Sequence, residues 1–508
     1  MELLGCFGIP PCRVGIGARE DRACVVERFG DDGRFDTALY RGVEFLTAIG
    51  QRLAFEEGSD PPVGVVGHRR QWFADTGGGF HLTAGDRFVD ELVCVALNVH
   101  DDSVGEGMTG LAKDIAHGAF RAALEAVEPE RVTRRALHGL QRNGRFDVAA
   151  ISHIVAIGKA APAMARGARA ELGDVPAIVV SSHPGDGAIP VIEGDHPVPG
   201  PRSFAAGGAV VDFLATAEGA CLFLISGGGS ALCEVAVDGV TPADIGVMND
   251  VLLASGLDIV DVNALRTVVS DLKAGGMSRS LSGPCLSLII SDVPVGGPEH
   301  VASGPTIPSR SGARAAPLIE VHGLGAALPA SVGEAAARWV PNPPRPHDVV
   351  EVVASGAVAA DAAASYLRSL GRSVSVGSVL SGSLDDEVLA MLEVSPGHVV
   401  VRAGEAIISV EGDGLGGRNQ HAALIAALRL EGSPGVFAAF GTDGRDGDTE
   451  AAGAVVDGTT VERITQAGLD AVSLAAAFDS HRALGASGDL VVTGATGTNV
   501  ADLWLSFG

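Results

Sequence analysis

Four charged side chains in this sequence stand where a catalytic site would need them. Lys159, Asp292 and Asp443 come shortly after apolar runs, and Arg418 comes directly after a glycine-rich turn. In an open α/β sheet, ligands bind outside the carboxyl ends of the strands. We therefore expect these side chains to meet in one crevice. There the lysine and arginine could bind an anion, and the aspartates could hold a metal ion or accept a proton.

The stretch 405–458 carries two of these residues. An apolar run at 406–410 leads into a glycine-rich turn, a helical pattern that begins near Arg418, and a second apolar run before Asp443 and Asp446. We predict strand, glycine turn, helix and strand in this order. The amide groups of the turn and the start of the helix would face an anion, and Arg418 adds a fork of donors. The two aspartates are candidate metal ligands or bases.

A run of three glycines forms a second candidate anion site. It follows the apolar run 221–225, which is typical of a strand buried in a parallel sheet. Glycines at such a strand end let a ligand approach the backbone closely, and serine hydroxyls on both sides add donors. We predict that this turn contacts phosphate; its residues are Ser226, Gly227, Gly228, Gly229 and Ser230.

A polar stripe marks the segment 258–276, which we predict to be one helix. Its spacings of three, four and three place four polar side chains on one face, opposite an apolar face. The polar residues are Asn263, Arg266, Ser270 and Lys273. This face could point to water or to a cleft, and the sequence alone favours neither.

Composition excludes several classes of protein. The 508 residues are 46% hydrophobic, which indicates a globular chain. A net charge of −26 without a basic stripe argues against nucleic-acid binding. No apolar stretch reaches the length of about 18 residues that a membrane span needs, and the N-terminus makes a poor signal peptide. Seven scattered cysteines without C-x-x-C indicate reduced thiols in the cytoplasm.

The predicted fold class is α/β. Aromatic residues are only 4% and glycines number 70, so cores of small aliphatic side chains with many glycine turns fit repeated βα units. We predict two Rossmann-like α/β domains with a cleft between them, at 108–340 and 347–508, joined by the proline-rich linker 341–346. Residues 1–107 are an unassigned N-terminal α+β segment. Residues 349–379 are expected to form one βαβ unit.

A lysine, an arginine and several aspartates around glycine turns fit phosphoryl transfer. That reaction needs positioning, cationic clamps and Mg²⁺ more than a covalent nucleophile. The P-loop pattern G-x-x-x-x-G-K-[ST] does not occur in the sequence, so a different nucleotide site is expected. The expected partner is a small molecule. A homodimer is compatible with the sequence, which does not fix the oligomeric state.

A set of motifs occurs in the order found in a known family. They are GKAAPAMARGA, DHPVPG, SGGGSAL, ASGLDIVDVNALRTVVSDLKAGG, SDVP, GDGLGGRNQ, GTDGRDG and GDLVVTGATGTNVADL. In these motifs, between about 110 and 503, the chain resembles the glycerate 2-kinase family with a MOFRL-type C-terminal domain, which would begin at about 402. The resemblance implies phosphorylation of D-glycerate to 2-phosphoglycerate with ATP and Mg²⁺. It also implies that the SGGGS turn contacts the nucleotide phosphates.

The resemblance implies roles for the candidate site residues. Lys159 and Arg418 would bind the substrate carboxylate or the transferring phosphoryl group. Asp292 and Asp443 would serve as metal ligand or base, without distinction between them, and Asp446 is a further candidate metal ligand. The candidate substrate-binding residues are Lys159, Asn263, Arg266, Arg418 and Asn419.

Two other functions remain open at this point. The pattern G-x-G-x-x-G at 412–417, between a predicted strand and helix, is also found in NAD(P)-linked dehydrogenases such as a hydroxypyruvate reductase. That function would leave the SGGGS and GKA turns without a role. A non-catalytic binder of phosphorylated metabolites draws on departures from the family pattern, such as Ala406 and His421. The presence of Lys159 and Asp292 argues against it.

Overall fold

The computed structural model describes residues 12–16, 23–29, 35–41, 104–185, 187 and 189–508. The chain divides into two compact units, residues 1–97 and 98–508. In the first unit, the described residues form an antiparallel three-stranded sheet. Its strands are β1 (Cys12–Ile16), β2 (Ala23–Phe29) and β3 (Phe35–Arg41).

The first large sheet of the second unit is wholly parallel, as predicted. Its order is β6-β5-β4-β7-β8-β9. The strands are β4 (Ile151–Ile157), β5 (Ala177–Ser181), β6 (Val191–Glu193), β7 (Ala220–Ile225), β8 (Cys285–Ile290) and β9 (Val349–Ala354). Every residue of β7 and β8 is buried, because helices cover both faces of a parallel sheet.

Alternate side chains of these strands enter two different cores, as the period of two in a strand requires. On one face, Leu222 and Leu224 pack with α5 (Pro129–Asn143) and α6 (Ala161–Leu172). On the other face, Phe223 packs with α7 (Pro201–Leu214). This arrangement places the carboxyl ends of β4, β7 and β8 side by side.

Four further helices pack on one another beyond this sheet. They are α9 (Pro242–Ala254), α10 (Ile259–Val268), α11 (Ala315–Val321) and α12 (Ala330–Arg338). The predicted single helix over 258–276 is therefore too long, since α10 ends at Val268. Beyond that residue the helical hydrogen bonds stop. The amide of Asp271, for example, donates to the carbonyl of Val235 instead.

The second large sheet is mixed rather than parallel. Its order is β10-β11-β15-β12-β13-β14, and only β10 and β11 run parallel. The strands are β10 (Ser373–Val376), β11 (His398–Gly404), β12 (Val436–Gly441), β13 (Gly453–Asp457), β14 (Leu490–Val491) and β15 (Asp502–Phe507). The α/β class is confirmed, but this half lacks the parallel sheet of a Rossmann-like domain. The last strand, β15, lies between β11 and β12.

The strand, helix and strand predicted at 349–379 are present, but the prediction that they form one βαβ unit is wrong. Strand β9 pairs with β8 in the first sheet, whereas β10 pairs with β11 in the second. The helix between them, α13 (Gly356–Ser369), packs against the second sheet. The chain therefore passes between the sheets after Ala354, and not within the proline-rich segment 341–346.

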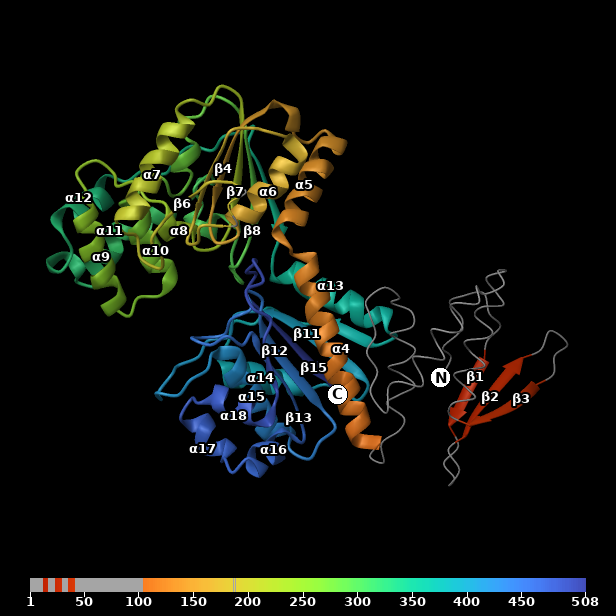
Figure 1. The fold of residues 1–508 in the computed structure, drawn as a ribbon. Helices are drawn as coiled ribbons and strands as arrows, with labels where there is room; N and C mark the ends of the chain where they lie inside the picture. The colour runs from red at the N-terminus through yellow and green to blue at the C-terminus, as the bar shows by residue number, and fades with distance from the viewer. Residues whose placement is uncertain (1–11, 17–22, 30–34, 42–103, 186, 188) are drawn as a thin grey trace. The chain divides into compact units, whose positions relative to one another are not determined.

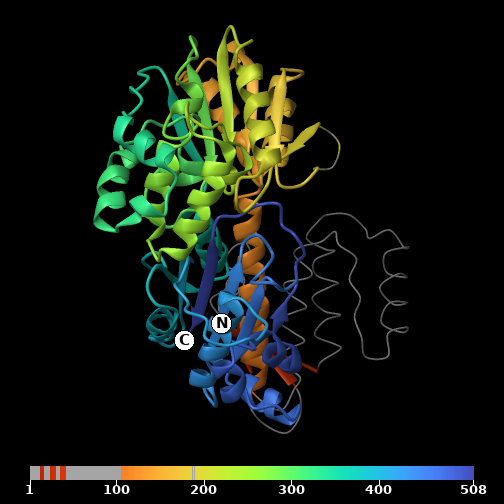
Figure 2. The same ribbon diagram turned by 90° about the vertical axis from the view of Figure 1, so that its left-hand side faces the viewer.

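Helices also cover both faces of the second sheet (Figures 1 and 2). One face carries α4 (Val104–Ala126) and α13, and Phe120 of α4 stacks on Phe440 of β12 at 4.2 Å between ring centroids. The other face carries α14 (Leu384–Leu392), α15 (Arg418–Leu430), α16 (Thr460–Gln466), α17 (Ala471–Ala476) and α18 (Ser480–Ser487). Among the described helices, none is long and apolar enough to cross a membrane.

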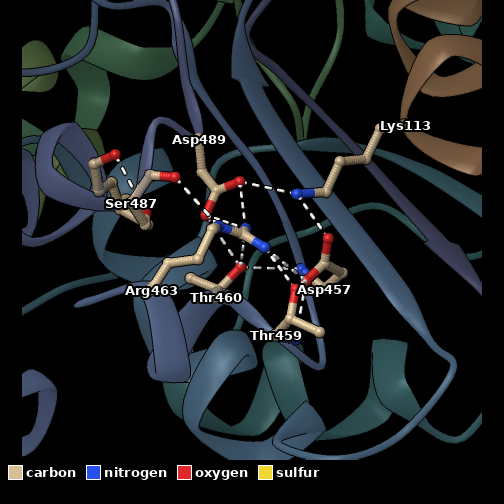
Figure 3. A network of polar contacts seen from close by, with 8 residues as sticks. Lys113, Asp457, Thr459, Thr460, Arg463, Ser487 and Asp489 are labelled. Atoms are coloured by element: carbon tan, nitrogen blue, oxygen red, sulfur yellow. Dashed lines mark hydrogen bonds and ion pairs between the residues drawn. The ribbon is translucent and has the colours of Figure 1, made fainter. Parts of the chain in front are cut away.

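A buried polar network fastens α4 to this half of the chain (Figure 3). Lys113 Nζ lies 2.6 Å from an Asp457 carboxylate oxygen and 2.7 Å from one of Asp489. Arg463 donates to both oxygens of Asp489 at 2.7 Å. Burial alone would raise the pKa of Asp457, but hydrogen bonds from Lys113 and Thr459 lower it to about 2.

Candidate functional site

A cavity of about 1010 Å³ is lined by residues from both sheets of the second unit. Asp292, just beyond β8 in the first sheet, lines it together with Arg418, Asn419, Asp443 and Asp446 from the other half. The structure therefore brings three of the four predicted charged residues, Asp292, Arg418 and Asp443, to one place. The sequence predicted that the residues would meet where strands of one sheet end. In the structure they meet between two sheets.

Lys159 lies beside this cavity at the carboxyl end of β4. Its amide bonds to the carbonyl of Gly227 after the neighbouring strand β7. The Asp292 carboxylate lies so close to Gly227 that a Cβ there would collide with it. Burial raises the pKa of Asp292, and the positive charge of Lys159 opposes that rise. Lys159 and Asp292 thus lie on the same glycine turn, and the charge of the lysine acts on the carboxylate.

Arg418 begins α15 and is held by two carboxylates. Its Nε donates to Asp502 at 2.6 Å, and its Nη1 donates to Glu405 at 2.7 Å. The remaining nitrogen, Nη2, has no acceptor among the residues that the structure describes. Burial raises the pKa of Asp502 to about 7, against the opposing effects of Arg418 and Asn419. This arrangement fixes the guanidinium at the cavity wall and leaves part of its fork for a ligand.

The side chains of Asn419 and Asp446 are engaged in hydrogen bonds within the protein. Asp446 accepts four hydrogen bonds, from the main-chain and side-chain nitrogens of Asn419 and Gln420 at 2.7–3.1 Å. A carboxylate has about four lone-pair positions, so Asp446 acts as the cap of α15, and its geometry does not support metal ligation. Asn419 also donates to Asp502 at 2.9 Å and accepts from Trp504 at 2.8 Å, which leaves little capacity for substrate.

Asp443 keeps free capacity. It follows β12 in a turn, is half-buried, and accepts one hydrogen bond, from the amide of Arg445 at 3.1 Å. Asp292, Asp443 and the exposed Asp448 are thus the lining aspartates without a full set of protein partners. Over the described residues, no group of three or more His, Cys, Asp or Glu could hold a metal ion. Two carboxylates fit Mg²⁺, which is usually bound by one or two carboxylates together with substrate phosphates.

The SGGGS turn is explained in part by the packing of the protein itself. Gly227 makes room for Asp292, Gly228 adopts a φ of +83°, and Gly229 lies against Ala302. The hydroxyl of Ser226 is buried and accepts from the amide of Ala160 at 3.1 Å. Glycine in this turn is therefore no evidence of a phosphate by itself, and the predicted phosphate contact stays a prediction.

Gly228 and Ser230 line a second, smaller cavity of about 110 Å³ together with Arg266. This cavity shares His196 and Pro197 with the large one, so the two adjoin. Asn263, which we predicted beside Arg266, lines neither cavity. Both residues lie on α10, and only this first part of the predicted polar stripe is helical, because the helix ends at Val268.

The glycine-rich segment 412–417 does not follow a strand directly. Strand β11 ends at Gly404, so the predicted strand at 406–410 is wrong, and a loop runs to the start of α15. Gly412 and Gly414 pack against the backbone at 477–479, where a Cβ would collide. In addition, β15 separates β11 from β12. The segment therefore lacks the strand–turn–helix context of a dinucleotide fingerprint.

Sequence reasoning missed several residues of the large cavity, among them Arg445, Asp448 and Asn499. Glu405 and Asp502 position Arg418, and His196 lies where the two cavities meet. His196 stands in a proline-rich segment that favours simple packing, and Asp502 begins a buried strand. The useful signal for Asp502 was an aspartate opening a wholly apolar run.

Comparison with known proteins agrees with this architecture. Residues 115–337 match a domain of unknown function, DUF4147, and residues 398–502 match the MOFRL family. The chain is 32% identical over 427 residues to a glycerate 2-kinase from Pyrococcus horikoshii, covering 77% of this chain and 96% of that protein. It is 33% identical over 420 residues to a D-glycerate 2-kinase from Thermotoga maritima, covering 77% and 97%.

Two further similarities bear on function. A protein from Agrobacterium vitis, provisionally named a hydroxypyruvate reductase, is 33% identical over 420 residues and is matched over 93% of its length. The crystal structure of a glycerate kinase from Thermotoga maritima superposes with a TM-score of 0.70 and 29% identity, covering 78% of this chain and 99% of that chain. The predicted family is confirmed: the chain belongs to the glycerate kinase family that carries a MOFRL domain.

Proposed function

We propose that this protein is an ATP-dependent glycerate 2-kinase that transfers the γ-phosphoryl group to the 2-hydroxyl of D-glycerate. One observation carries the proposal. Asp292 from the parallel half lines the same cavity as Arg418 and Asp443 from the mixed half, with Lys159 beside it. The names of the relatives from Pyrococcus and Thermotoga support the substrate.

The charges of the cavity fit a polyphosphate only with cations present. The lining aspartates that lack full protein partners are Asp292, Asp443 and Asp448, and a single cation, Arg418, pairs with both Glu405 and Asp502. When bound, Mg²⁺ would neutralise charge on the nucleotide phosphates. Asp443, with an oxygen free at the cavity, would hold the ion.

Asp292 is the proposed proton acceptor. Burial raises its pKa, which brings a carboxylate closer to the basicity that general-base catalysis needs. As the 2-hydroxyl oxygen bonds to phosphorus, the bond from phosphorus to the ADP oxygen breaks, and the hydroxyl proton moves to Asp292. Lys159 and Arg418 would stabilise the charge on the transferring group.

The test is release of ADP from ATP in the presence of Mg²⁺ and D-glycerate, with the product examined by ³¹P NMR. We expect 2-phosphoglycerate, which this method distinguishes from 3-phosphoglycerate. ADP release that does not depend on glycerate, or oxidation of NADH with hydroxypyruvate in place of ADP release, would overturn the proposal. The second outcome would follow the name of the Agrobacterium relative.

The cytoplasm is the proposed location. Three cysteines, Cys221, Cys233 and Cys285, are buried as free thiols. Burial raises the pKa of Cys233 to about 12, so this thiol stays protonated and unreactive at neutral pH. Free thiols of this kind are usual in a reducing compartment.

A further inference from the structure

The small cavity beside the SGGGS turn has a wall of mixed character. Apolar side chains of Ile245, Met248 and Val269 line it, and Arg266 enters from α10. Gly228 and His196 form the part of the wall that adjoins the large cavity. A cavity with apolar walls and a few convergent polar groups is the usual form of a small-molecule site.

Arg266 is held in place by a neutral partner. Its Nε donates to Asn249 Oδ1 at 3.0 Å, and Asn249 in turn donates from Nδ2 to the carbonyl of Ile245 at 3.0 Å. Asn249 is only 1% exposed, so the amide is fixed. In the described part of the chain, the two terminal nitrogens of Arg266 have no acceptor, and no carboxylate forms an ion pair with this guanidinium.

Glu234 lines the same cavity and its charge acts on Arg266, but it does not form an ion pair with this arginine in the described structure. Glu234 is 2% exposed and bonds to Lys273 through one oxygen, and to Ser270 and the amide of Val235 through the other. Lys273 is 4% exposed, so the Glu234–Lys273 pair neutralises itself inside the protein. Arg266 therefore remains as one uncompensated positive charge in a partly buried wall. Such a charge is costly without an anion.

The size of the cavity limits the anion. Drug-sized ligands occupy roughly 300–1,000 Å³, and a water molecule takes about 30 Å³ of liquid volume. A cavity of about 110 Å³ therefore has room for an acid of a few heavy atoms, and not for a nucleotide. The large cavity, of about 1010 Å³, has room for the nucleotide.

We infer that Arg266 binds the carboxylate of the hydroxy-acid substrate in this small cavity, so that the acid's hydroxyl end points past His196 toward the large cavity. This inference rests on the proposed function and deepens it. It separates two roles that the sequence leaves joined: Arg266 binds the acid, whereas Lys159 and Arg418 serve the transferring phosphoryl group. Gly228 connects the two places, because it lines the small cavity and lies against the Lys159 and His196 side chains.

The test is the KM for D-glycerate and for ATP in wild type, Arg266→Met and Arg266→Lys. A hydrogen-bonded ion pair to a carboxylate contributes an amount equivalent to roughly 10- to 100-fold in binding. We expect Arg266→Met to raise the KM for D-glycerate by about that factor and to leave the KM for ATP within about twofold. Arg266→Lys keeps the charge and loses the fork of donors, so its KM for D-glycerate should lie between those of wild type and Arg266→Met.

Arg279→Met is the matched control. Arg279 follows α10 in the sequence and is exposed. It pairs with Asp271 and lines neither cavity. It should keep both KM values. Circular dichroism and thermal melting establish that each variant is folded. A rise in the KM for ATP instead, or no change in either KM, would overturn the inference and point to a nucleotide contact or a structural arginine.

Calorimetric titration of D-glycerate, with and without a non-hydrolysable ATP analogue and Mg²⁺, separates this inference from the proposed function. Binding that Arg266→Met weakens, in a protein without kinase turnover, would sustain the acid site and overturn the kinase. If wild type turns over and Arg266→Met binds D-glycerate with full affinity, the kinase would be sustained and the acid site overturned. Titration of the neutral analogue glyceramide should show the same weak binding to wild type and to Arg266→Met.

Discussion

Two polar clusters of the mixed-sheet half are each built around buried aspartates, and they use them in opposite ways. In one, Lys113 and Arg463 enclose Asp457 and Asp489, and none of these residues lines either cavity (Figure 3). In the other, Arg418, Glu405 and Asp502 stand at the wall of the large cavity.

The pKa directions of their acids differ as well. The pKa of Asp457 is lowered to about 2, because several donors outweigh burial. The pKa of Asp502 is raised to about 7, because burial and the nearby Asp446 outweigh Arg418 and Asn419. A closed cluster with enough donors stabilises the fold. A cluster short of positive charge at a cavity wall is prepared for a ligand.

The largest expected difference between the clusters is in catalysis. Arg418→Met should lower kcat by roughly 10³-fold, because an arginine on the transferring phosphoryl group contributes about 10³–10⁵ in rate. Arg463→Met, the matched change in the closed cluster, should keep kcat within about twofold of wild type. Steady-state kinetics of both folded variants checks this, and equal losses would abolish the distinction.

Next in size is the stability of the closed cluster. Lys113→Met leaves Asp457 and Asp489 with fewer partners, and breaking a buried ion pair costs roughly 3–5 kcal/mol. Because Lys113 is partly exposed, we expect a loss near the lower end, about 3 kcal/mol, in urea unfolding. Lys159→Met, a change beside the cavity, should lower the free energy of unfolding far less. A stable Lys113→Met protein would show that the cluster does not fasten α4.

The pH dependence of stability should have opposite signs in the two clusters. For Asp457, the folded pKa lies below its ordinary value of 3.8, so its contribution is present above pH 3.8 and is lost as pH falls toward 2. For Asp502, the folded pKa lies above 3.8, so its contribution is present below pH 3.8 and is lost as pH rises through 7.

Unfolding free energies of wild type, Asp457→Asn and Asp502→Asn between pH 3 and 8 measure these slopes. The difference from wild type for Asp457→Asn should amount to roughly 2 kcal/mol at neutral pH and shrink in acid. For Asp502→Asn, the asparagine protein should gain stability relative to wild type as pH rises from 4 to 7. Slopes of the same sign in both variants would contradict the account.

The smallest contrast concerns two aspartates of one turn. Asp446→Asn should cost about 1 kcal/mol of stability as a helix cap and leave the Mg²⁺ concentration for half-maximal activity unchanged. Asp443→Asn should keep stability and raise that Mg²⁺ concentration by roughly tenfold, the range for a lost interaction with a charged group. A reversed pattern would mean that Asp446, not Asp443, holds the ion.

The sequence predicts most of the parallel half, because strands such as β4, β7 and β8 are apolar runs that end at a glycine turn or shortly before a charged residue. The short strand β6 was not predicted. It fails in the mixed half for a physical reason. Strand β15 pairs with β11, about a hundred positions earlier in the chain, and with β12, more than sixty positions earlier. No local pattern shows that β15 inserts between the other two. The strand predicted at 406–410 failed likewise, since alternating burial there comes from loop packing.

The candidate site was predictable to the same extent. Lys159, Asp292 and Asp443 were found from their position after strands, which a sequence displays directly, and Arg418 was found from its position at the start of a helix. Asp446 and Asn419 looked equally suitable, and only their hydrogen bonds separate a helix cap from a ligand. The cavity of Arg266 could not be foreseen, because it depends on the early end of α10 and on Asn249 from another helix.

The central claim is that the two halves of the chain act on one reaction. It is tested most directly by kcat/KM for D-glycerate in wild type, Lys159→Met, Arg418→Met and the double variant. Each single change should cost roughly 10²–10³-fold, and the double variant should lose far less than the product of the two, because groups acting on one transition state are not additive. Full multiplicative losses, or wild-type activity in either single variant, would contradict a shared site.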